Sequence, residues 1–198
     1  MNSSNTDMSI NHVPGHIKHD GHNLTGFIIF LCSESIIFLS FFAGYAILKL
    51  TAPVWYPDGV NGIEIKMPLI NTIILVSSSF VIYFAERCLH KKNLLGFRFI
   101  WLITMLMGGY FVYGQYIEWS ELTFSLDSGV FGGLFYLLTG FHGLHVITGI
   151  LLMGIMFIRS FIPNNYKNGE IGVESVSLFW HFVDVIWIML FALIYLWQ

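Results

Sequence analysis

The chain has 198 residues, of which 56% are hydrophobic and 11% are charged, and its mean hydropathy is +0.71. This composition excludes an ordinary water-soluble domain and is typical of a membrane protein. The formal net charge of −3, without any basic cluster, gives no reason to expect nucleic acid as a partner. Cys32 and Cys88 lie in or beside different apolar runs without Cys-x-x-Cys spacing, so we predict neither a disulfide nor a thiolate metal site.

Residues 1–23 are polar and lack an apolar core, so we predict an N-terminal tail and not a cleaved signal peptide. The tail carries four histidines at spacings of four, three and three. This spacing would suit a metal held on a transient helical turn, but the composition favours a histidine-rich tail without fixed structure. The four are His12, His16, His19 and His22.

Residues 24–198 contain five apolar runs long enough to cross a bilayer, and the connections between them are too short to hold a soluble domain. We therefore predict an all-α fold, a bundle of five transmembrane helices. The fourth run would be about 42 Å long against a hydrocarbon core of about 30 Å, so it should tilt or protrude. The predicted spans are 24–50, 67–89, 97–116, 130–157 and 176–197.

The positively charged residues predict that the N-terminus is inside and the C-terminus is outside. With this orientation, only Lys49 and Lys66 fall in outer segments. The inner segments would hold Lys18, Arg87, Lys91, Lys92, Arg98, Arg159 and Lys167.

Two ionisable residues of the last span stand three apart, so His181 and Asp184 share one face of a helix. An acidic side chain at membrane depth costs about 3 kcal/mol even on the lenient insertion scale. We therefore expect this face to point toward protein. The simplest interpretation is a hydrogen bond or ion pair that joins two helices. The functional alternatives are a phospholipid headgroup site and a proton relay.

Glu34 lies ten residues into the first span, which places it about 15 Å from the inner end of that helix. Its neighbours at helical spacing are apolar, and an acid in such surroundings is expected to be neutral much of the time. It could act as a protonatable group or as a hydrogen-bond donor to another helix. The neighbours are Phe30, Ile37, Phe38 and Phe41.

The depth of each residue places His142 and His145 of the fourth span near the same level. We therefore expect one polar layer across three helices, made of Glu34, His142, His145, His181 and Asp184. The late histidines with Asp184 also match a zinc or iron ligand set in residue type, but no established metal motif is present. Gln115 and Glu118 share a face at the outer end of the third span, where we expect an ordinary interface contact.

Two stretches resemble the signature segments of subunit III of the haem–copper terminal oxidases: residues 180–187 (WHFVDVIW) and 140–146 (GFHGLHV). Further similarity covers all five spans, at Ser33-Glu34, Asn71-Thr72 and residues 114–119 (GQYIEW). The chain resembles the short, five-helix bacterial form of the family, of the cytochrome c oxidase type. The longer form of the family has two more helices at its front.

The resemblance implies a subunit with no redox centre, bound to a proton-pumping oxidase that reduces dioxygen to water. The haem and copper would lie in partner subunits, and the partners implied are subunit I, subunit II, a small subunit IV and phospholipids. Glu34 matches the carbodiimide-reactive intramembrane acid of the family, which is taken to support proton uptake. His142, His145, His181 and Asp184 match the polar positions of its late helices. The expected location is the bacterial plasma membrane, with the thylakoid membrane as the alternative.

Four other functions remain as alternatives at this point. Two lie within the same superfamily, namely subunit III of a quinol oxidase and the accessory protein of nitric oxide reductase. An independent transporter or channel would use Glu34 and the His/Asp layer, although five helices without inverted repeats argue against it. A membrane metalloenzyme would need bound metal, and we expect no haem or copper in this chain because no suitable ligand set is present.

Overall fold

A computed structural model describes residues 20–57, 59, 62–162, 166 and 171–197 of the chain. The histidines His12, His16 and His19 of the predicted tail lie outside these residues. The described part is all-helical, and five of its helices are long and apolar enough to span a membrane, which confirms the predicted fold class.

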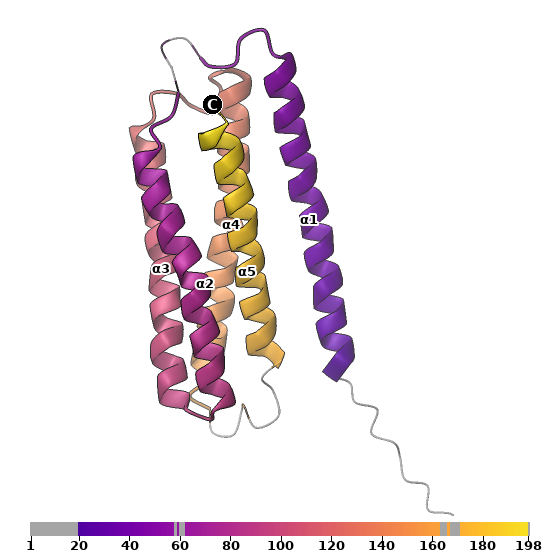
Figure 1. Cartoon of the computed structure of the whole chain (residues 1–198), viewed down its shortest axis with the longest axis vertical. Helices are drawn as coiled ribbons and strands as arrows, with labels where there is room; N and C mark the ends of the chain where they lie inside the picture. Colours follow the sequence, from indigo (N-terminus) through magenta and orange to yellow (C-terminus); the bar gives the residue numbers. More distant parts are fainter. Residues whose placement is uncertain (1–19, 58, 60–61, 163–165, 167–170, 198) are drawn as a thin grey trace, which may run out of the picture.

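The helices run up and down beside one another and are joined by short connections (Figure 1). Each begins or ends beyond its predicted apolar run, because polar residues at a helix end can continue the backbone hydrogen bonding. The bounds are α1 Asp20–Thr51, α2 Lys66–His90, α3 Leu94–Glu121, α4 Gly129–Arg159, α5 Ile171–Phe191 and a final π-helical turn η1 Ala192–Leu196.

A tight turn makes α2 and α3 antiparallel neighbours. The backbone N–H of Lys92 bonds to the carbonyl of Leu89, and Lys92 itself adopts the left-handed conformation with a φ of 59°. The side chain of Asn93 then accepts a hydrogen bond from the N–H of Gly96 at 3.0 Å and caps the start of α3. This capping satisfies one of the donors that every helix start leaves unpaired.

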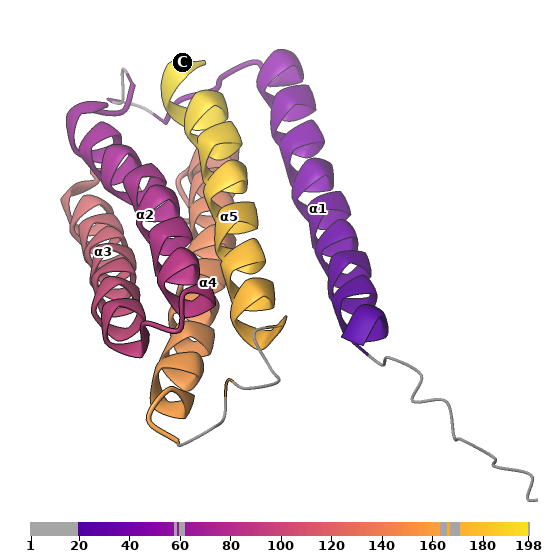
Figure 2. The same ribbon diagram turned by 60° about the horizontal axis from the view of Figure 1, so that its bottom comes forward.

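Helix α5 occupies the centre of the bundle, between α2, α4 and α1 (Figures 1 and 2). Trp180 and Trp187 of α5 are fully buried, and their indole N–H groups donate to Ser78 and Thr72 of α2 at 2.8 and 2.9 Å. Buried side-chain hydrogen bonds of this kind hold transmembrane helices together.

One glycine of α3 and one of α4 leave room for a large aromatic ring of α5. A Cβ atom at Gly108 of α3 would stand 2.5 Å from the ring of Trp180, and one at Gly149 of α4 would stand 2.8 Å from it. The Trp180 ring therefore occupies the space that these two glycines leave open. Small residues have this role at many membrane helix interfaces.

Helix α1 stands at the edge of the bundle and its lower half diverges from the other helices in both views (Figures 1 and 2). Phe38 of α1 is buried, and its ring centroid lies 5.1 Å from that of Phe141 of α4 and 6.3 Å from that of Phe182 of α5. Near the C-terminal end of α1, the ammonium of Lys49 bonds to the backbone carbonyl of Trp197 and lies over the Trp55 and Trp197 rings.

Candidate functional site

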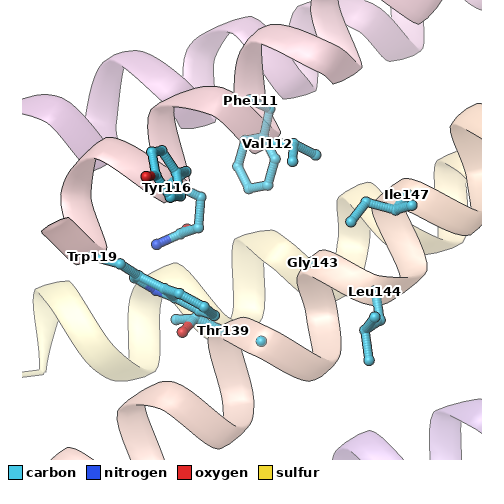
Figure 3. A pocket seen from close by; sticks show the side chains of 10 residues that line it. Phe111, Val112, Tyr116, Trp119, Thr139, Gly143, Leu144 and Ile147 are labelled. Carbon is cyan, nitrogen blue, oxygen red and sulfur yellow. The ribbon is translucent and has the colours of Figure 1, made fainter. Parts of the chain in front are cut away.

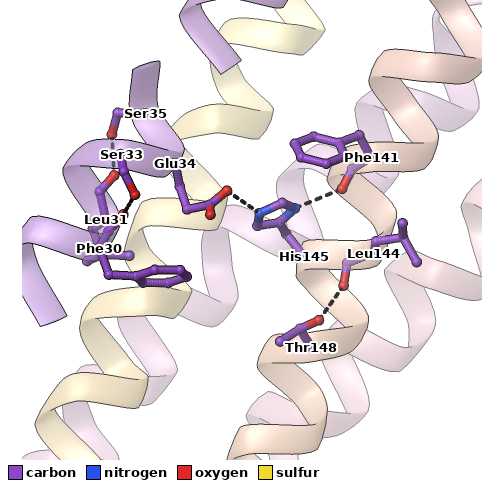
Figure 4. A network of polar contacts seen from close by, with 9 residues as sticks. All are labelled: Phe30, Leu31, Ser33, Glu34, Ser35, Phe141, Leu144, His145 and Thr148. Carbon is purple, nitrogen blue, oxygen red and sulfur yellow. Dashed lines mark hydrogen bonds and ion pairs between the residues drawn. The ribbon is translucent and has the colours of Figure 1, made fainter. Parts of the chain in front are cut away.

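Glu34 of α1 faces His145 of α4, which joins two of the predicted polar residues across a helix interface (Figure 4). The Glu34 Oε2 and His145 Nε2 atoms are 3.2 Å apart. The other ring nitrogen of His145, Nδ1, lies 2.8 Å from the backbone carbonyl of Phe141, one turn earlier on the same helix.

These contacts fix how many protons the pair holds. A backbone carbonyl can only accept, so His145 Nδ1 must carry a hydrogen and donate it to Phe141. In a neutral ring Nε2 then has no hydrogen, and Glu34 must be protonated to donate to it. If Glu34 is ionised, His145 must be an imidazolium. In either case one proton lies between Glu34 and His145, so the pair can exchange it over a single hydrogen bond.

The surroundings of this pair are aromatic. The His145 ring lies 5.0 Å from the Phe38 ring, 4.8 Å from the Phe141 ring and 6.2 Å from the Phe179 ring, measured between centroids. The side chains of His145 and Glu34 are 13% and 17% exposed. The low polarity around the pair strengthens its hydrogen bond and disfavours separated charges.

The second polar group joins α5 to α2 through a residue that the sequence did not single out. The hydroxyl of Ser79 donates to Asp184 Oδ2 and also lies 2.9 Å from His181 Nδ1. His181 and Asp184 therefore both contact the same residue of α2. The signal for Ser79 was weak because serine is common in membrane helices and its partners lie more than 100 residues away in sequence.

His142 is enclosed apart from both groups, so the predicted layer is divided. Its fully buried ring lies between Phe111 of α3 and Trp187 of α5, with centroid distances of 5.8 and 4.8 Å. Neither of its ring nitrogens has a hydrogen-bond partner in the described part of the chain. His142 and His145 are three residues apart, hence about 60° apart around the helix axis, which directs them toward different neighbours.

A third buried network lies near the far end of α3 and includes a residue that the sequence analysis missed. Gln115 Nε2 donates to Glu118 Oε2 at 2.9 Å, and the hydroxyl of Tyr195 donates to Glu118 Oε1 at 2.7 Å. Gln115 and Glu118 are 6% and 7% exposed. Their contact is thus internal to this chain, with a tyrosine near the C-terminus as the third member.

A groove of about 430 Å³ opens between α3 and α4 (Figure 3). Its lining is largely apolar, and Gly143 stands where a Cβ atom would meet nothing within 4 Å. The lining residues are Phe111, Val112, Gln115, Tyr116, Trp119, Thr139, Gly140, Gly143, Leu144 and Ile147.

The metal-ligand alternative receives no support from this geometry. Among the described residues, no three or more His, Cys, Asp or Glu side chains come together in a way that could hold a metal ion. The residues considered as ligands lie in three separate places. His145 pairs with Glu34, His181 and Asp184 contact Ser79, and His142 stands apart.

Comparisons with known proteins agree with the sequence resemblance. The family model described as "Cytochrome c oxidase subunit III" matches residues 7–198. A protein named cytochrome c oxidase subunit 3 from Synechocystis is 40% identical over 196 residues, which covers 96% of this chain and 84% of that protein. One of the same name from Thermostichus vulcanus is 40% identical over 197 residues, 99% of this chain and 96% of that protein.

The similarity extends to an animal protein of the same name. Cytochrome c oxidase subunit 3 of Oryctolagus cuniculus is 36% identical over 179 residues, which covers 87% of this chain but 68% of the longer relative. The shared part therefore includes nearly all of the five-helix chain, and the relative has additional sequence outside it.

Proposed function

The chain belongs to the cytochrome c oxidase subunit III family, and from this premise we propose that it is the non-redox subunit III of a proton-pumping terminal oxidase. The observation that carries the proposal is 40% identity over nearly the whole chain to proteins of that name. In this role the chain supports an enzyme complex that reduces dioxygen to water, while the haem and copper lie in other subunits.

The proposed partners are subunit I, subunit II and a small subunit IV, in the bacterial plasma membrane or the thylakoid membrane. The exposed side of α1 supports an interface with another subunit, because only 17% of its most apolar 18-residue window is buried within this chain. The proposed orientation has the N-terminus inside, in agreement with the positive charges at the ends joining α2 to α3.

The proposed role of Glu34 is to hold and exchange a proton at the edge of the chain. Its support is the shared proton that the His145 contacts require, together with the position of Glu34 on the least buried helix. His142, His181 and Asp184 are proposed to hold the late helices together as inter-helix polar contacts. The Trp187 ring against His142 and the Ser79 bridge support this assignment.

We further propose that the groove between α3 and α4 holds one acyl chain of a membrane phospholipid. Acyl chains are the solvent at this depth, and the lining is apolar apart from a few polar side chains such as Gln115 and Thr139. Leu144 on its border is exposed, so the groove is open toward the bilayer.

The variant Gly143→Leu tests the groove, because its side chain would enter open space and occupy the volume proposed for the acyl chain. We expect native mass spectrometry to show at least one phospholipid fewer per chain, while folding is unchanged. The matched control is Gly109→Leu, where a Cβ atom likewise meets nothing within 4 Å but the residue does not line the groove. Equal phospholipid retention in Gly143→Leu and the wild-type chain would reject the groove as a binding site.

Affinity purification in mild detergent tests the function as a whole. We expect the tagged chain to bring with it haem-containing oxidase subunits, identified by mass spectrometry and by the optical spectrum of the complex. Oxygen consumption with reduced cytochrome c as the donor would distinguish this complex from a quinol oxidase. Purification of the chain without haem proteins, or ion flux through the chain alone in vesicles, would contradict the proposal.

A further inference from the structure

The Ser79 hydroxyl of α2 contacts both His181 and Asp184 of α5. Its Oγ atom donates to Asp184 Oδ2 and lies 2.9 Å from His181 Nδ1. Asp184 is 3% exposed, whereas His181 is partly exposed. The bridge therefore connects a ring that the surroundings can reach with a carboxyl group that they cannot.

The hydrogen atoms available limit how this bridge can be arranged. A serine hydroxyl has one hydrogen, and here it is given to Asp184. The contact with His181 then requires that Nδ1 carries a hydrogen and donates it to the Ser79 oxygen. In the neutral ring Nε2 has a lone pair, so it is the nitrogen that can take up an additional proton.

Ionisable side chains gather at one end of the same α2–α5 interface. His90 of α2 lies 4.0 Å from Glu174 of α5, and both are largely exposed at the end that the positive charges predict to be inside. Glu86, one turn deeper on α2, lies close enough to Glu174 and His90 for their charges to act on it. Ser177 precedes His181 by one helical turn on α5.

Other charged groups around α5 belong to separate networks. Glu34 of α1 pairs with His145 of α4, whose ring stacks on Phe179. His142 of α4 stands against Trp187, and Glu118 of α3 binds Tyr195. Among the described residues, no hydrogen bond connects any of these groups to Ser79, His181 or Asp184.

We propose that His181, Ser79 and Asp184 form a proton relay across the α2–α5 interface. A proton arriving at His181 Nε2 makes an imidazolium. The Nδ1 hydrogen then passes to the Ser79 oxygen while the Ser79 hydrogen passes to Asp184 Oδ2. The result is a neutral ring with its hydrogen on Nε2 and a neutral carboxylic acid. One proton has been added, and the two opposite charges that it would otherwise leave in a buried site are removed.

The relay stores a proton on Asp184, which lies about 20 Å along α5 from Ile171, at a rise of about 1.5 Å per residue. The protons would come from water at the Glu86, His90 and Glu174 end. The inference concerns hydrogen bonds inside this chain, so it stands or falls independently of the proposed function.

The experiment is nuclear magnetic resonance of the full chain in lipid membranes, with ¹⁵N-labelled histidine and His181 assigned by the variant His181→Gln. We expect the neutral His181 ring to carry its hydrogen on Nδ1 in the wild type. Ser79→Thr retains the hydroxyl and should preserve this tautomer, whereas Ser79→Ala should shift at least half of the population to the other tautomer. Ser77→Ala is the matched control, because the Ser77 hydroxyl bonds to the backbone carbonyl of Ile73 in its own helix.

Infrared spectroscopy of the same samples follows the carboxyl group, with the band assigned by Asp184→Asn. We expect the carbonyl band of protonated Asp184 to rise over the same pH interval in which the His181 hydrogen moves from Nδ1 to Nε2. In Ser79→Ala the two midpoints should separate by more than about one pH unit. Three results would each overturn the relay: a wild-type ring that carries its hydrogen on Nε2 while Asp184 is still ionised, separate midpoints in the wild type, or identical behaviour of Ser79→Ala and the wild type. If Ser79→Ala fails to fold, the wild-type tautomer and Ser79→Thr still decide.

Discussion

Helix α1 and helix α5 carry acidic residues in the same membrane-spanning bundle, but in opposite settings. In the most apolar window of each helix, 17% of α1 and 56% of α5 is buried within the chain. Asp184 of α5 is bound by a serine of α2, whereas Glu34 of α1 meets a single histidine at the edge of the bundle. Asp184 is therefore held by contacts inside the chain, whereas Glu34 lies at the edge of the bundle, near neighbouring subunits or lipid.

The comparison separates two uses of an ionisable residue in a membrane. A carboxyl group enclosed by its own chain contributes to helix association and is costly to remove, because its partners lose their hydrogen bonds. A carboxyl group at the edge of the bundle contributes less to stability, and its protonation can respond to a neighbouring subunit or to lipid. The following predictions test this distinction in order of expected effect.

The largest effect is expected where the Trp180 ring of α5 lies against Gly108 of α3. Gly108→Leu would place a Cβ atom 2.5 Å from the ring of fully buried Trp180, which has no space to move into. Overpacking costs about 1–3 kcal/mol, occasionally more, so we expect a loss of about 3 kcal/mol or more in the free energy of unfolding. The neighbouring Gly109→Leu, where a Cβ atom meets open space, should unfold like the wild type in a detergent melt. Equal melting of the two variants would show that α5 is not packed as described.

A smaller loss is expected from Asp184→Ala, which leaves Ser79 without its acceptor. Leaving a buried polar group unpaired costs about 1–3 kcal/mol. We also expect the variant chain to be lost more readily from its complex on detergent washing, because α2 and α5 are held less firmly. Glu121→Ala changes an exposed acid at the end of α3 and serves as the control. Retention equal to that of the wild type would contradict the role given to Asp184.

A still smaller effect is expected from His145→Ala at the edge of the bundle. It removes one hydrogen bond to Glu34, and such bonds between membrane helices contribute about 0.6 kcal/mol on average. Hydrogen exchange of the backbone should increase in α1 and remain unchanged in α5. A loss of stability as large as that of Asp184→Ala would remove the difference between the two helices.

The sequence alone predicted the five helices, because a run of about 20 apolar residues in a chain of this composition is almost always a membrane-spanning helix. It also drew attention to Glu34, His145, His181 and Asp184, whose side chains contact other helices. It did not reveal their partners, because Ser79 lies more than 100 residues from His181 and Tyr195 is 77 residues from Glu118. His142 shows the limit of helical spacing, since 60° of rotation from His145 directs its ring toward Phe111 and Trp187.

The central claim is that Glu34 exchanges a proton and is not required for assembly. It is tested most directly by Glu34→Gln in the purified complex, with subunit retention and loss of oxygen-reducing activity per turnover measured in the same sample. The account predicts wild-type retention of all subunits together with altered proton uptake or earlier inactivation during turnover. Loss of the complex, or proton uptake and durability identical to those of the wild type, would contradict it.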